Sequence, residues 1–262
     1  MNIQYKKKLQ KSVYMKGVLL DMEGVIRDSK NAFHHAYEKA LEAVGLKLNS
    51  YPAATWKLRG FAELNHQDEF LKALYAIAKN GEDITRILWK KYPVEYVKEL
   101  MKKTPISKED FEKMHYAYNK TLTDPKVFRR IPPVRAGKKG AKLLKDYGFT
   151  LGIVTNAKRE YNQIWMQDRE VIDMFETVIT SEDASQPKPS PEMILKACKK
   201  LGLKPSETYY LGDSEADIMA AKAAGCIPIG IMSGSTERAV LKKLGAKEVY
   251  KSVTEFALKF KR

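Results

Sequence analysis

Residues 18–21 read Val-Leu-Leu-Asp, a short apolar run that stops at the carboxylate of Asp21. Comparable apolar runs follow along the chain, at residues 149–154, 177–179, 209–211 and 227–231. Runs this short and this apolar are typical of strands that are buried on both faces, as in a parallel sheet. The sequence therefore predicts a mainly parallel sheet in which residues 18–20 form the first strand.

Amphipathic segments with the period of helices separate the later runs. They cover residues 138–147, 191–201 and 215–224, and a glycine follows each of them. Glycine just past the last turn is a common end of a helix, because it adopts the left-handed conformation without strain. Repeated strand–helix units predict a doubly wound α/β fold.

Residues 30–130 interrupt this alternation. They contain no convincing strand, and their helical patterns cover residues 32–44, 65–78, 82–91 and 108–119. Three prolines mark the return to the sheet: Pro125, Pro132 and Pro133. We therefore divide the chain into an N-terminal extension (1–14), an α/β core (15–29 and 131–262) and a helical insertion (30–130).

The composition is that of an ordinary globular protein, with 262 residues, 44% of them apolar and 30% charged. No uncharged run reaches the roughly 18 residues of a membrane span. The lysines near the N-terminus are not followed by the apolar stretch of a secretory signal. Cys198 and Cys226 stand in apolar surroundings and resemble buried thiols in a reducing compartment. We expect a cytoplasmic protein that does not contact membranes.

The formal net charge of +15 has two interpretations. It can indicate nucleic-acid binding, because a basic surface attracts phosphates, or a solvated surface with a bias toward anionic substrates. The lysines are spread over polar helix faces, as at Lys196, Lys199 and Lys200, with no interleaving of arginine and aromatic residues. We therefore favour the second interpretation and expect no nucleic-acid partner.

Polar residues stand where three of the predicted strands end: Asp21, Thr155 with Asn156, and Asp213. In open α/β sheets, ligands bind beyond the carboxyl ends of the strands. Each of these residues alone is more typical of a helix cap. Their occurrence at three strand ends that the fold brings together predicts a ligand site at this edge of the sheet.

Four stretches resemble, in order and in spacing, the motifs of the haloacid dehalogenase superfamily. Residues 21–29, Asp-Met-Glu-Gly-Val-Ile-Arg-Asp-Ser, resemble its first motif, and residues 153–156, Ile-Val-Thr-Asn, its second. Residues 188–192, Lys-Pro-Ser-Pro-Glu, resemble the third, and residues 212–218, Gly-Asp-Ser-Glu-Ala-Asp-Ile, the fourth. Within this superfamily, the sequence most resembles the phosphoglycolate phosphatase and β-phosphoglucomutase-like branches. The resemblance implies a Rossmann-like core with residues 30–130 as a helical cap.

The resemblance also implies an activity, the Mg²⁺-dependent hydrolysis of a small phosphate monoester. Asp21 would be the nucleophile that carries the phosphoryl group, and Lys188 would hold Asp21 and the phosphoryl oxygens. Oxygen ligands for Mg²⁺ would come from Asp21, Asp213, Asp217 and the backbone carbonyl of Glu23. The substrate would be bound by Thr155, Asn156 and the backbone N–H groups at Met22 and Gly24.

Simpler explanations exist for single residues of this set. Lys188 could be a solvated loop lysine, although the prolines around it stiffen the loop that presents it. Asp217 could be a first-turn acid that the helix dipole favours. That explanation leaves Asp21 and Asp213 without a role.

Glu23 departs from the family pattern, which in phosphatases has aspartate two residues after the nucleophile as the general acid and base. The extra methylene displaces the carboxylate by about 1 Å, and a misplacement of that order can lower a rate around 10²-fold. The chain could thus be a phosphatase, a phosphomutase or dehalogenase on the same scaffold, or a non-catalytic binding protein. Dehalogenase-type relatives carry a non-acidic residue at this position, so Glu23 favours phosphoryl chemistry.

We expect the helical insertion to select the substrate. Arg59 lies in a loop-like stretch after Pro52 that resembles the cap loop facing the active site. It is a candidate contact for a second anionic group, and a solvated arginine is the alternative. The expected partner is a small phosphorylated metabolite, and the expected assembly is a monomer or a homodimer.

Overall fold

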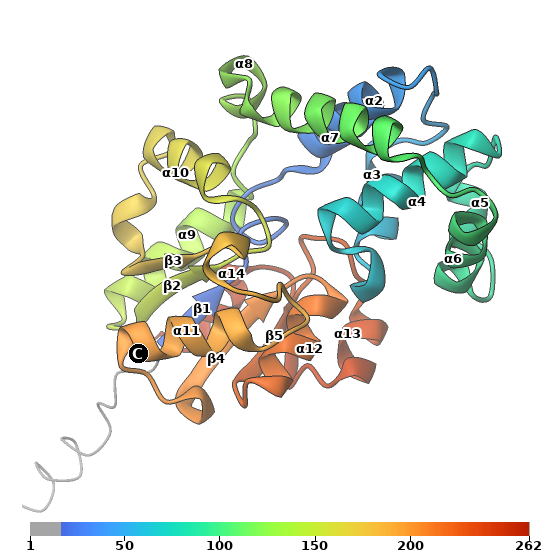
Figure 1. Ribbon diagram of the computed structural model, residues 1–262. Coiled ribbons are helices and arrows are strands. Elements are labelled where there is room, and N and C mark those ends of the chain that lie inside the picture. The colour runs from blue at the N-terminus through green and yellow to red at the C-terminus, as the bar shows by residue number, and fades with distance from the viewer. Residues whose placement is uncertain (1–16, 262) are drawn as a thin grey trace, which may run out of the picture.

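The computed structural model describes residues 17–261, in which six parallel strands form one sheet (Figure 1). The strand order is β3-β2-β1-β4-β5-β6. The strands are β1 Gly17–Leu20, β2 Thr150–Val154, β3 Thr177–Ile179, β4 Thr208–Gly212, β5 Ile227–Ile231 and β6 Glu248–Tyr250. The predicted doubly wound α/β fold is confirmed. The predicted extension, residues 1–14, lies outside the described residues.

The register of the sheet brings the polar strand ends together. Leu20 pairs with Ile153 of β2 on one side and with Leu211 of β4 on the other. The backbone N–H of Asp21 continues this ladder and donates to the carbonyl of Leu211 at 2.9 Å. Residues that directly follow β1, β2 and β4 therefore lie at one edge of the sheet.

Helices cover both faces of the sheet. Successive side chains of a strand point to opposite faces, so an apolar strand such as β1 contributes to a core on each side. Val18 and Leu20 of β1 belong to a large core cluster that also contains Leu144 and Phe256. Leu19, between them, belongs to a second cluster with Ile194. All three β1 side chains are fully buried, which explains why this strand contains no polar residue before Asp21.

The core helices are α9 Arg135–Asp146, α10 Arg159–Asp168, α11 Glu192–Leu201, α12 Glu215–Ala223, α13 Arg238–Leu244 and α14 Val253–Leu258. Between them lie the 3₁₀ turns η2 Ile172–Met174, η3 Ser181–Asp183 and η4 Pro205–Glu207. Helices α9, α11 and α12 lie where the periodicity predicts them, and Gly202 after α11 has the left-handed φ of 64°. Helices α10, α13 and α14 were not predicted. The seven and six residues of α13 and α14 are too few to show a helical period. Among the described side chains of α10, only two apolar ones are buried, Trp165 and Met166.

Between β1 and α9 the chain is helical. The helices are α2 Lys30–Glu42, α3 Pro52–Arg59, α4 Gln67–Lys79, α5 Ile84–Leu88, α6 Pro93–Lys103, α7 Lys108–Thr123 and α8 Pro125–Phe128, with the 3₁₀ turn η1 Ala62–Leu64. They gather above the sheet as a separate layer (Figure 1). A cluster of aromatic rings holds them together, including Tyr37 stacked on Tyr118 at 5.1 Å and Phe33 stacked on Trp56 at 5.8 Å between ring centroids.

The expectation of a loop-like stretch after Pro52 is wrong. Residues 52–59 form α3, and Arg59 is its last residue. Proline is well suited to the first position of a helix, where its fixed φ is already helical and no N–H partner is lost. Ala54, Trp56 and Leu58 of α3 are buried. None of the described helices is long and apolar enough to cross a membrane.

Candidate active site

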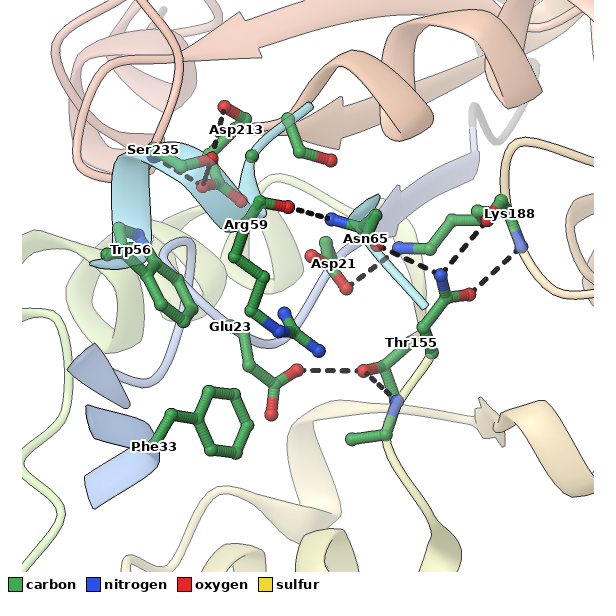
Figure 2. A pocket seen from close by; sticks show the side chains of 14 residues that line it. Asp21, Glu23, Phe33, Trp56, Arg59, Asn65, Thr155, Lys188, Asp213 and Ser235 are labelled. Carbon is green, nitrogen blue, oxygen red and sulfur yellow. Dashed lines mark hydrogen bonds and ion pairs between the residues drawn. The ribbon is translucent and has the colours of Figure 1, made fainter. Parts of the chain in front are cut away.

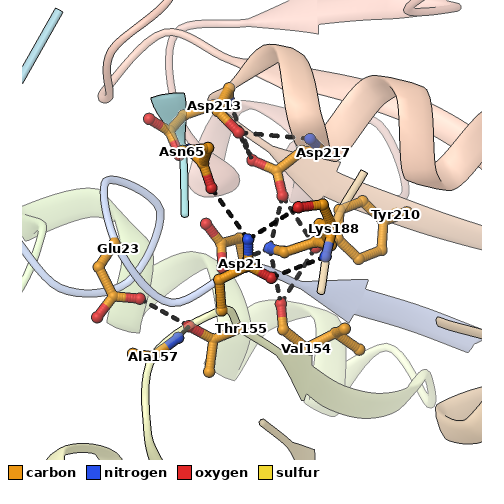
Figure 3. Close-up of polar contacts among 12 residues, drawn as sticks. Asp21, Glu23, Asn65, Val154, Thr155, Ala157, Lys188, Tyr210, Asp213 and Asp217 are labelled. Carbon is orange, nitrogen blue, oxygen red and sulfur yellow. Dashed lines mark hydrogen bonds and ion pairs between the residues drawn. The ribbon is translucent and has the colours of Figure 1, made fainter. Parts of the chain in front are cut away.

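Three carboxylates meet at the edge of the sheet where the strand order reverses. Asp21 follows β1, Asp213 follows the neighbouring β4, and Asp217 lies in the first turn of α12. A carboxylate oxygen of each lies within 4.8 Å of the others, and all three side chains are buried. Figure 3 shows them together with Lys188. A reversal in strand order opens a crevice at the carboxyl ends of the strands, and the cluster lies there.

Two glycines let the loops around Asp213 approach it closely. Gly24 has a φ of 75°, and a Cβ there would lie 2.7 Å from the Asp213 carboxylate. A Cβ at Gly234, in the loop after β5, would lie 1.8 Å from the same group. The next residue, Ser235, donates to Asp213 Oδ2 from its backbone N–H at 2.7 Å and from its hydroxyl at 3.1 Å.

Ser235 was not among the predicted site residues. Its only sequence signal is the Ser233-Gly234-Ser235 stretch just beyond a predicted strand. The same edge-of-sheet argument that selected Asp21 and Asp213 applies to that stretch, so this residue could have been found.

Lys188 is the cation of the cluster. Its buried Nζ lies 2.9 Å from Asp21 Oδ1 and donates to Asp217 Oδ1 at 2.7 Å, to the Tyr210 hydroxyl at 2.9 Å and to the Val154 carbonyl at 3.1 Å. Burial disfavours the charged ammonium, but Asp21 and Asp217 outweigh burial and raise the pKa of Lys188 above its ordinary value. The solvated-lysine interpretation of Lys188 is therefore wrong.

Asp217 serves the helix and the cluster at once. Its Oδ2 accepts from the backbone N–H and the hydroxyl of Ser214, which forms a capping box at the start of α12. Its Oδ1 accepts from Lys188 and from the Tyr210 hydroxyl. The first-turn interpretation and the site interpretation of Asp217 thus describe the two oxygens of one carboxylate.

The cluster has more negative than positive groups. Burial, opposed by Lys188 and reinforced by Asp217, raises the pKa of Asp21 well above its ordinary value. Burial and Asp217 raise the pKa of Asp213 to about 7. Three carboxylates that face a single ammonium group are a donor set that fits a divalent cation, because an ion there would remove their mutual repulsion.

Glu23 is turned away from this cluster (Figure 3). Its Oε2 accepts from the Thr155 hydroxyl at 2.8 Å, and its Oε1 forms an ion pair with Arg27. Burial opposes ionisation, but the Arg27 guanidinium and the Thr155 hydroxyl hold the pKa of Glu23 below its ordinary value. Arg27 was not among the predicted site residues.

Thr155 and Asn156 connect the predicted motifs. Thr155 is fully buried, donates to Glu23 and accepts from the backbone N–H of Ala157. The Asn156 amide accepts from the Lys188 N–H at 2.9 Å and donates to the Lys188 carbonyl at 3.1 Å. These two residues therefore position Glu23 and the Lys188 loop. Met22 is fully buried in the apolar core, so its backbone alone is available to a ligand.

The helical layer closes over the strand ends. Figure 2 shows Arg59 reaching from α3 into the cavity toward Glu23, beside Phe33 and Trp56. The Arg59 guanidinium lies over the Phe33 ring at 5.0 Å, and its Nε donates to the Tyr37 hydroxyl at 2.8 Å. The cavity is about 30 Å³, room for about two or three water molecules when about 10–15 Å³ holds one.

Polar contacts hold the layer against the sheet. The Asn156 amide donates to Asn65 Oδ1 at 3.0 Å. The backbone N–H of Ala62 donates to the Glu215 carboxylate at 3.3 Å, and Lys57 pairs with Glu237 at 2.6 Å. Most of the predicted site residues line one cavity: Asp21, Glu23, Arg59, Thr155, Asn156, Lys188 and Asp213. Asp217 does not line it and contacts Lys188. The helical layer covers this cavity, so the structure is in a closed arrangement.

Comparison with known proteins agrees with this geometry. The family model named "Haloacid dehalogenase-like hydrolase" matches residues 18–231. The phosphoglycolate phosphatase of Salmonella typhi is 27% identical over 223 residues, which are 84% of this chain and 82% of that protein. Two solved structures share the fold. A predicted phosphoglycolate phosphatase from Haemophilus somnus 129pt has a TM-score of 0.69 and 19% identity, over 96% of this chain and all of that one.

The second solved structure is a predicted phosphatase from Clostridium acetobutylicum, with a TM-score of 0.70 and 19% identity over 94% of this chain and 97% of that one. At such identities these structures speak for the fold alone. The family match says more than the fold, because it covers the sequence from β1 to β5 and includes every carboxylate of the buried cluster. The chain belongs to the haloacid dehalogenase-like hydrolase family.

Proposed function

We propose that the chain is a phosphatase that hydrolyses a small phosphate monoester by way of a phosphoryl group carried on Asp21. The observation that carries the proposal is the 2.9 Å contact between Asp21 and Lys188 inside a buried set of three carboxylates. Phosphate esters resist attack because the nucleophile and the phosphoryl oxygens repel each other. Asp21 has a cation beside it that offsets this repulsion, and the relatives named phosphoglycolate phosphatase support the reaction class.

The donor set is best suited to Mg²⁺. Asp21, Asp213 and Asp217 offer hard oxygen atoms, and the family resemblance adds the backbone carbonyl of Glu23 as a further candidate. Mg²⁺ prefers oxygen ligands and retains several waters, so two or three protein ligands are sufficient. When bound, the ion would neutralise charge on the phosphoryl oxygens.

The remaining residues have roles that follow from their places. The Asp21 carboxylate would attack phosphorus, while Lys188 and the backbone N–H of Met22 would bind the phosphoryl oxygens. The Gly24 N–H, expected to do the same, donates instead to the Arg27 carbonyl at 2.8 Å. Glu23 would exchange a proton with the leaving oxygen and then with the attacking water. Thr155 would orient Glu23, to which it already donates.

The substrate would be small and carry a second anionic group. Arg59 brings a guanidinium into the cavity, and its pKa is raised above the ordinary value despite burial, by the nearby tyrosines and by Glu23. Such a guanidinium favours a carboxylate or a phosphate as its partner. Because the closed cavity is so small, the helical layer, residues 30–130, would act as a cap that opens to admit the substrate.

A panel of phosphate monoesters, assayed with Mg²⁺ and with EDTA, tests this proposal. We expect phosphate release that requires Mg²⁺ and that falls by roughly 10³-fold or more in Asp21→Asn, which loses the nucleophile but keeps the shape of the side chain. Asp146→Asn, an exposed residue of α9 paired with Lys142, is the matched control and should retain the parent rate. Turnover of a 2-haloacid or of a sugar phosphate isomer without phosphate release would contradict the proposal.

A further inference from the structure

Arg27 is an arginine that the solvent hardly reaches, with 1% of its surface exposed. A buried guanidinium is costly unless it is paired and hydrogen-bonded. Its partner is Glu23, which is 6% exposed. The two residues do not lie on a helix; a tight loop in which Gly24 N–H donates to the Arg27 carbonyl at 2.8 Å brings them together. The loop that carries the first motif is thus folded around this ion pair.

The Arg27 guanidinium is also held from two other parts of the chain. Its Nη2 donates to Asn162 of α10 at 3.1 Å. It lies over the ring of Trp165, also of α10, at 5.5 Å, and over the ring of Phe128 at 5.3 Å. Phe128 is the last residue of α8, where the helical layer returns to the core. The guanidinium therefore lies between the core and the end of the helical layer.

Both connections between the helical layer and the sheet pass beside Arg27. Residues 27–29 lead from the motif into α2, and Arg27 forms a bridge with Pro133 on the returning connection. The carbonyl of Ile131 on that connection accepts from the Trp165 indole N–H at 2.9 Å. Any movement of the helical layer must bend these two connections, because they are its covalent links to the sheet.

We propose that Arg27 is a positioning residue for Glu23 that also links the placement of Glu23 to the position of the helical layer. The ion pair fixes one oxygen of the Glu23 carboxylate, and the Thr155 hydroxyl donates a hydrogen bond to the other. Glutamate has one more rotatable bond than aspartate, so without this anchor its carboxylate would sample several rotamers. Phe128, at the end of the helical layer, packs on the same guanidinium. Arg27 therefore has this contact when the layer is closed, and an opening of the layer would change it.

This inference rests on the proposed function, because it assigns the purpose of the anchor to proton transfer by Glu23. Arg27→Lys keeps the positive charge but loses the planar group that reaches Asn162 and stacks on the two rings. We expect its kcat/KM on an alkyl phosphate, a poor leaving group, to fall roughly 10- to 100-fold. On p-nitrophenyl phosphate, whose leaving group needs no proton, kcat/KM reports only the transfer of the phosphoryl group to Asp21 and should stay near the parent value.

Arg169→Lys is the matched control. Arg169 donates to the carbonyls of Arg129 and Ile131 on the same returning connection, and none of its described contacts is with Glu23. We expect Arg169→Lys to hydrolyse both esters at the parent rates. In a Glu23→Gln background, Arg27→Lys should add no further loss, because the two residues act as one unit.

Equal losses of kcat/KM on both esters in Arg27→Lys, or a further loss in the Glu23→Gln background, would show that Arg27 is only structural. Failure of the parent enzyme on every ester would instead refute the proposed function. If the parent enzyme is inactive, a crystal structure of Arg27→Lys still tests whether Arg27 positions Glu23. We expect Glu23 to leave the Thr155 hydroxyl in that structure, and an unchanged Glu23 would overturn the inference.

Discussion

Lys188 neutralises two buried carboxylates, Asp21 and Asp217, at distances of 2.9 and 2.7 Å. Lys188→Met retains the length of the side chain and leaves both carboxylates unpaired. We expect kcat to fall by about 10²–10³-fold and the free energy of unfolding to fall by about 3–5 kcal/mol, measured by steady-state kinetics and urea unfolding. Lys196→Met, which removes an exposed ion pair with Glu192, should change stability by less than about 1 kcal/mol. A Lys188→Met enzyme with the parent kcat would remove Lys188 from the mechanism.

Glu23→Asp would restore the residue of the family motif, and a simple geometric view predicts a faster enzyme. The structure favours the opposite outcome, because the shorter side chain would withdraw from Arg27 and Thr155 and leave the guanidinium buried without its carboxylate. We expect Glu23→Asp to have a lower kcat on poor leaving groups and a lower melting temperature than the parent. A Glu23→Asp enzyme that is faster and equally stable would show that the loop accommodates aspartate.

The sequence was a good guide to single residues whose motif fixes their place, such as Asp21, Lys188 and Asp213. It was a poor guide to Arg27, which donates to a partner on α10 that is 135 residues away. No local pattern marks such a contact, because Arg27 alone looks like an ordinary loop residue, and the folded chain is needed to reveal it. Ser235 differs, because its place just beyond a predicted strand is a signal that the sequence contains.

At the scale of elements, strands buried on both faces and most of the helices of nine residues or more could be predicted, since their apolar pattern is long and uninterrupted. Helix α10, with ten residues, was not predicted. Helix α6 was missed although it has eleven residues, because three of them alone are buried: Val94, Val97 and Leu100. The stretch after Pro52, expected to be loop-like, is helix α3, and Pro52 is its first residue. The arrangement of the helical layer over the strand ends depends on tertiary contacts and could not be predicted.

Asn65 joins the helical layer to the second and third motifs. Its Oδ1 accepts from Asn156, which in turn holds both backbone groups of Lys188. Asn65→Ala removes this hydrogen bond between the layer and the core, worth about 0.5–1.5 kcal/mol. It also removes a bond within the layer, from the Asn65 amide to the Arg59 carbonyl at 3.3 Å. We expect kcat/KM to fall about 3- to 10-fold with little change in the melting temperature. Asn80→Ala, which lies in the same layer but bonds to Ala76 and Thr104, should leave kcat/KM unchanged, and equal effects in both variants would exclude a role for Asn65 in closure.

The protein as a whole should respond to pH through its buried carboxylates. Asp213 has a pKa of about 7 in the folded protein, against an ordinary value of 3.8, because burial and Asp217 raise it. A raised pKa means that the folded state binds the proton more tightly than the unfolded chain. The stability gained from this proton is therefore fully present below about pH 4 and is lost as the pH rises through about 7.

Magnesium should offset this loss, because metal ligands must be deprotonated to bind. We expect Mg²⁺ to raise the melting temperature more at pH 8 than at pH 5, and EDTA to reverse the gain. Asp213→Asn should lose most of the gain at pH 8, whereas Asp146→Asn should keep it. An equal rise in melting temperature at both pH values would show that Mg²⁺ does not bind at the carboxylate cluster.

The place of β1 in the middle of the sheet has a consequence for biosynthesis. Its neighbours begin at Thr150 and Thr208, so the strand that ends at Asp21 leaves the ribosome long before either of them exists. The helices between β1 and α9 pack mainly on one another and can begin to fold while translation continues. Pairing between such distant segments is slow to form. The nascent chain therefore carries the start of its active site through most of translation, and the carboxylates can meet only after Asp217 has been added.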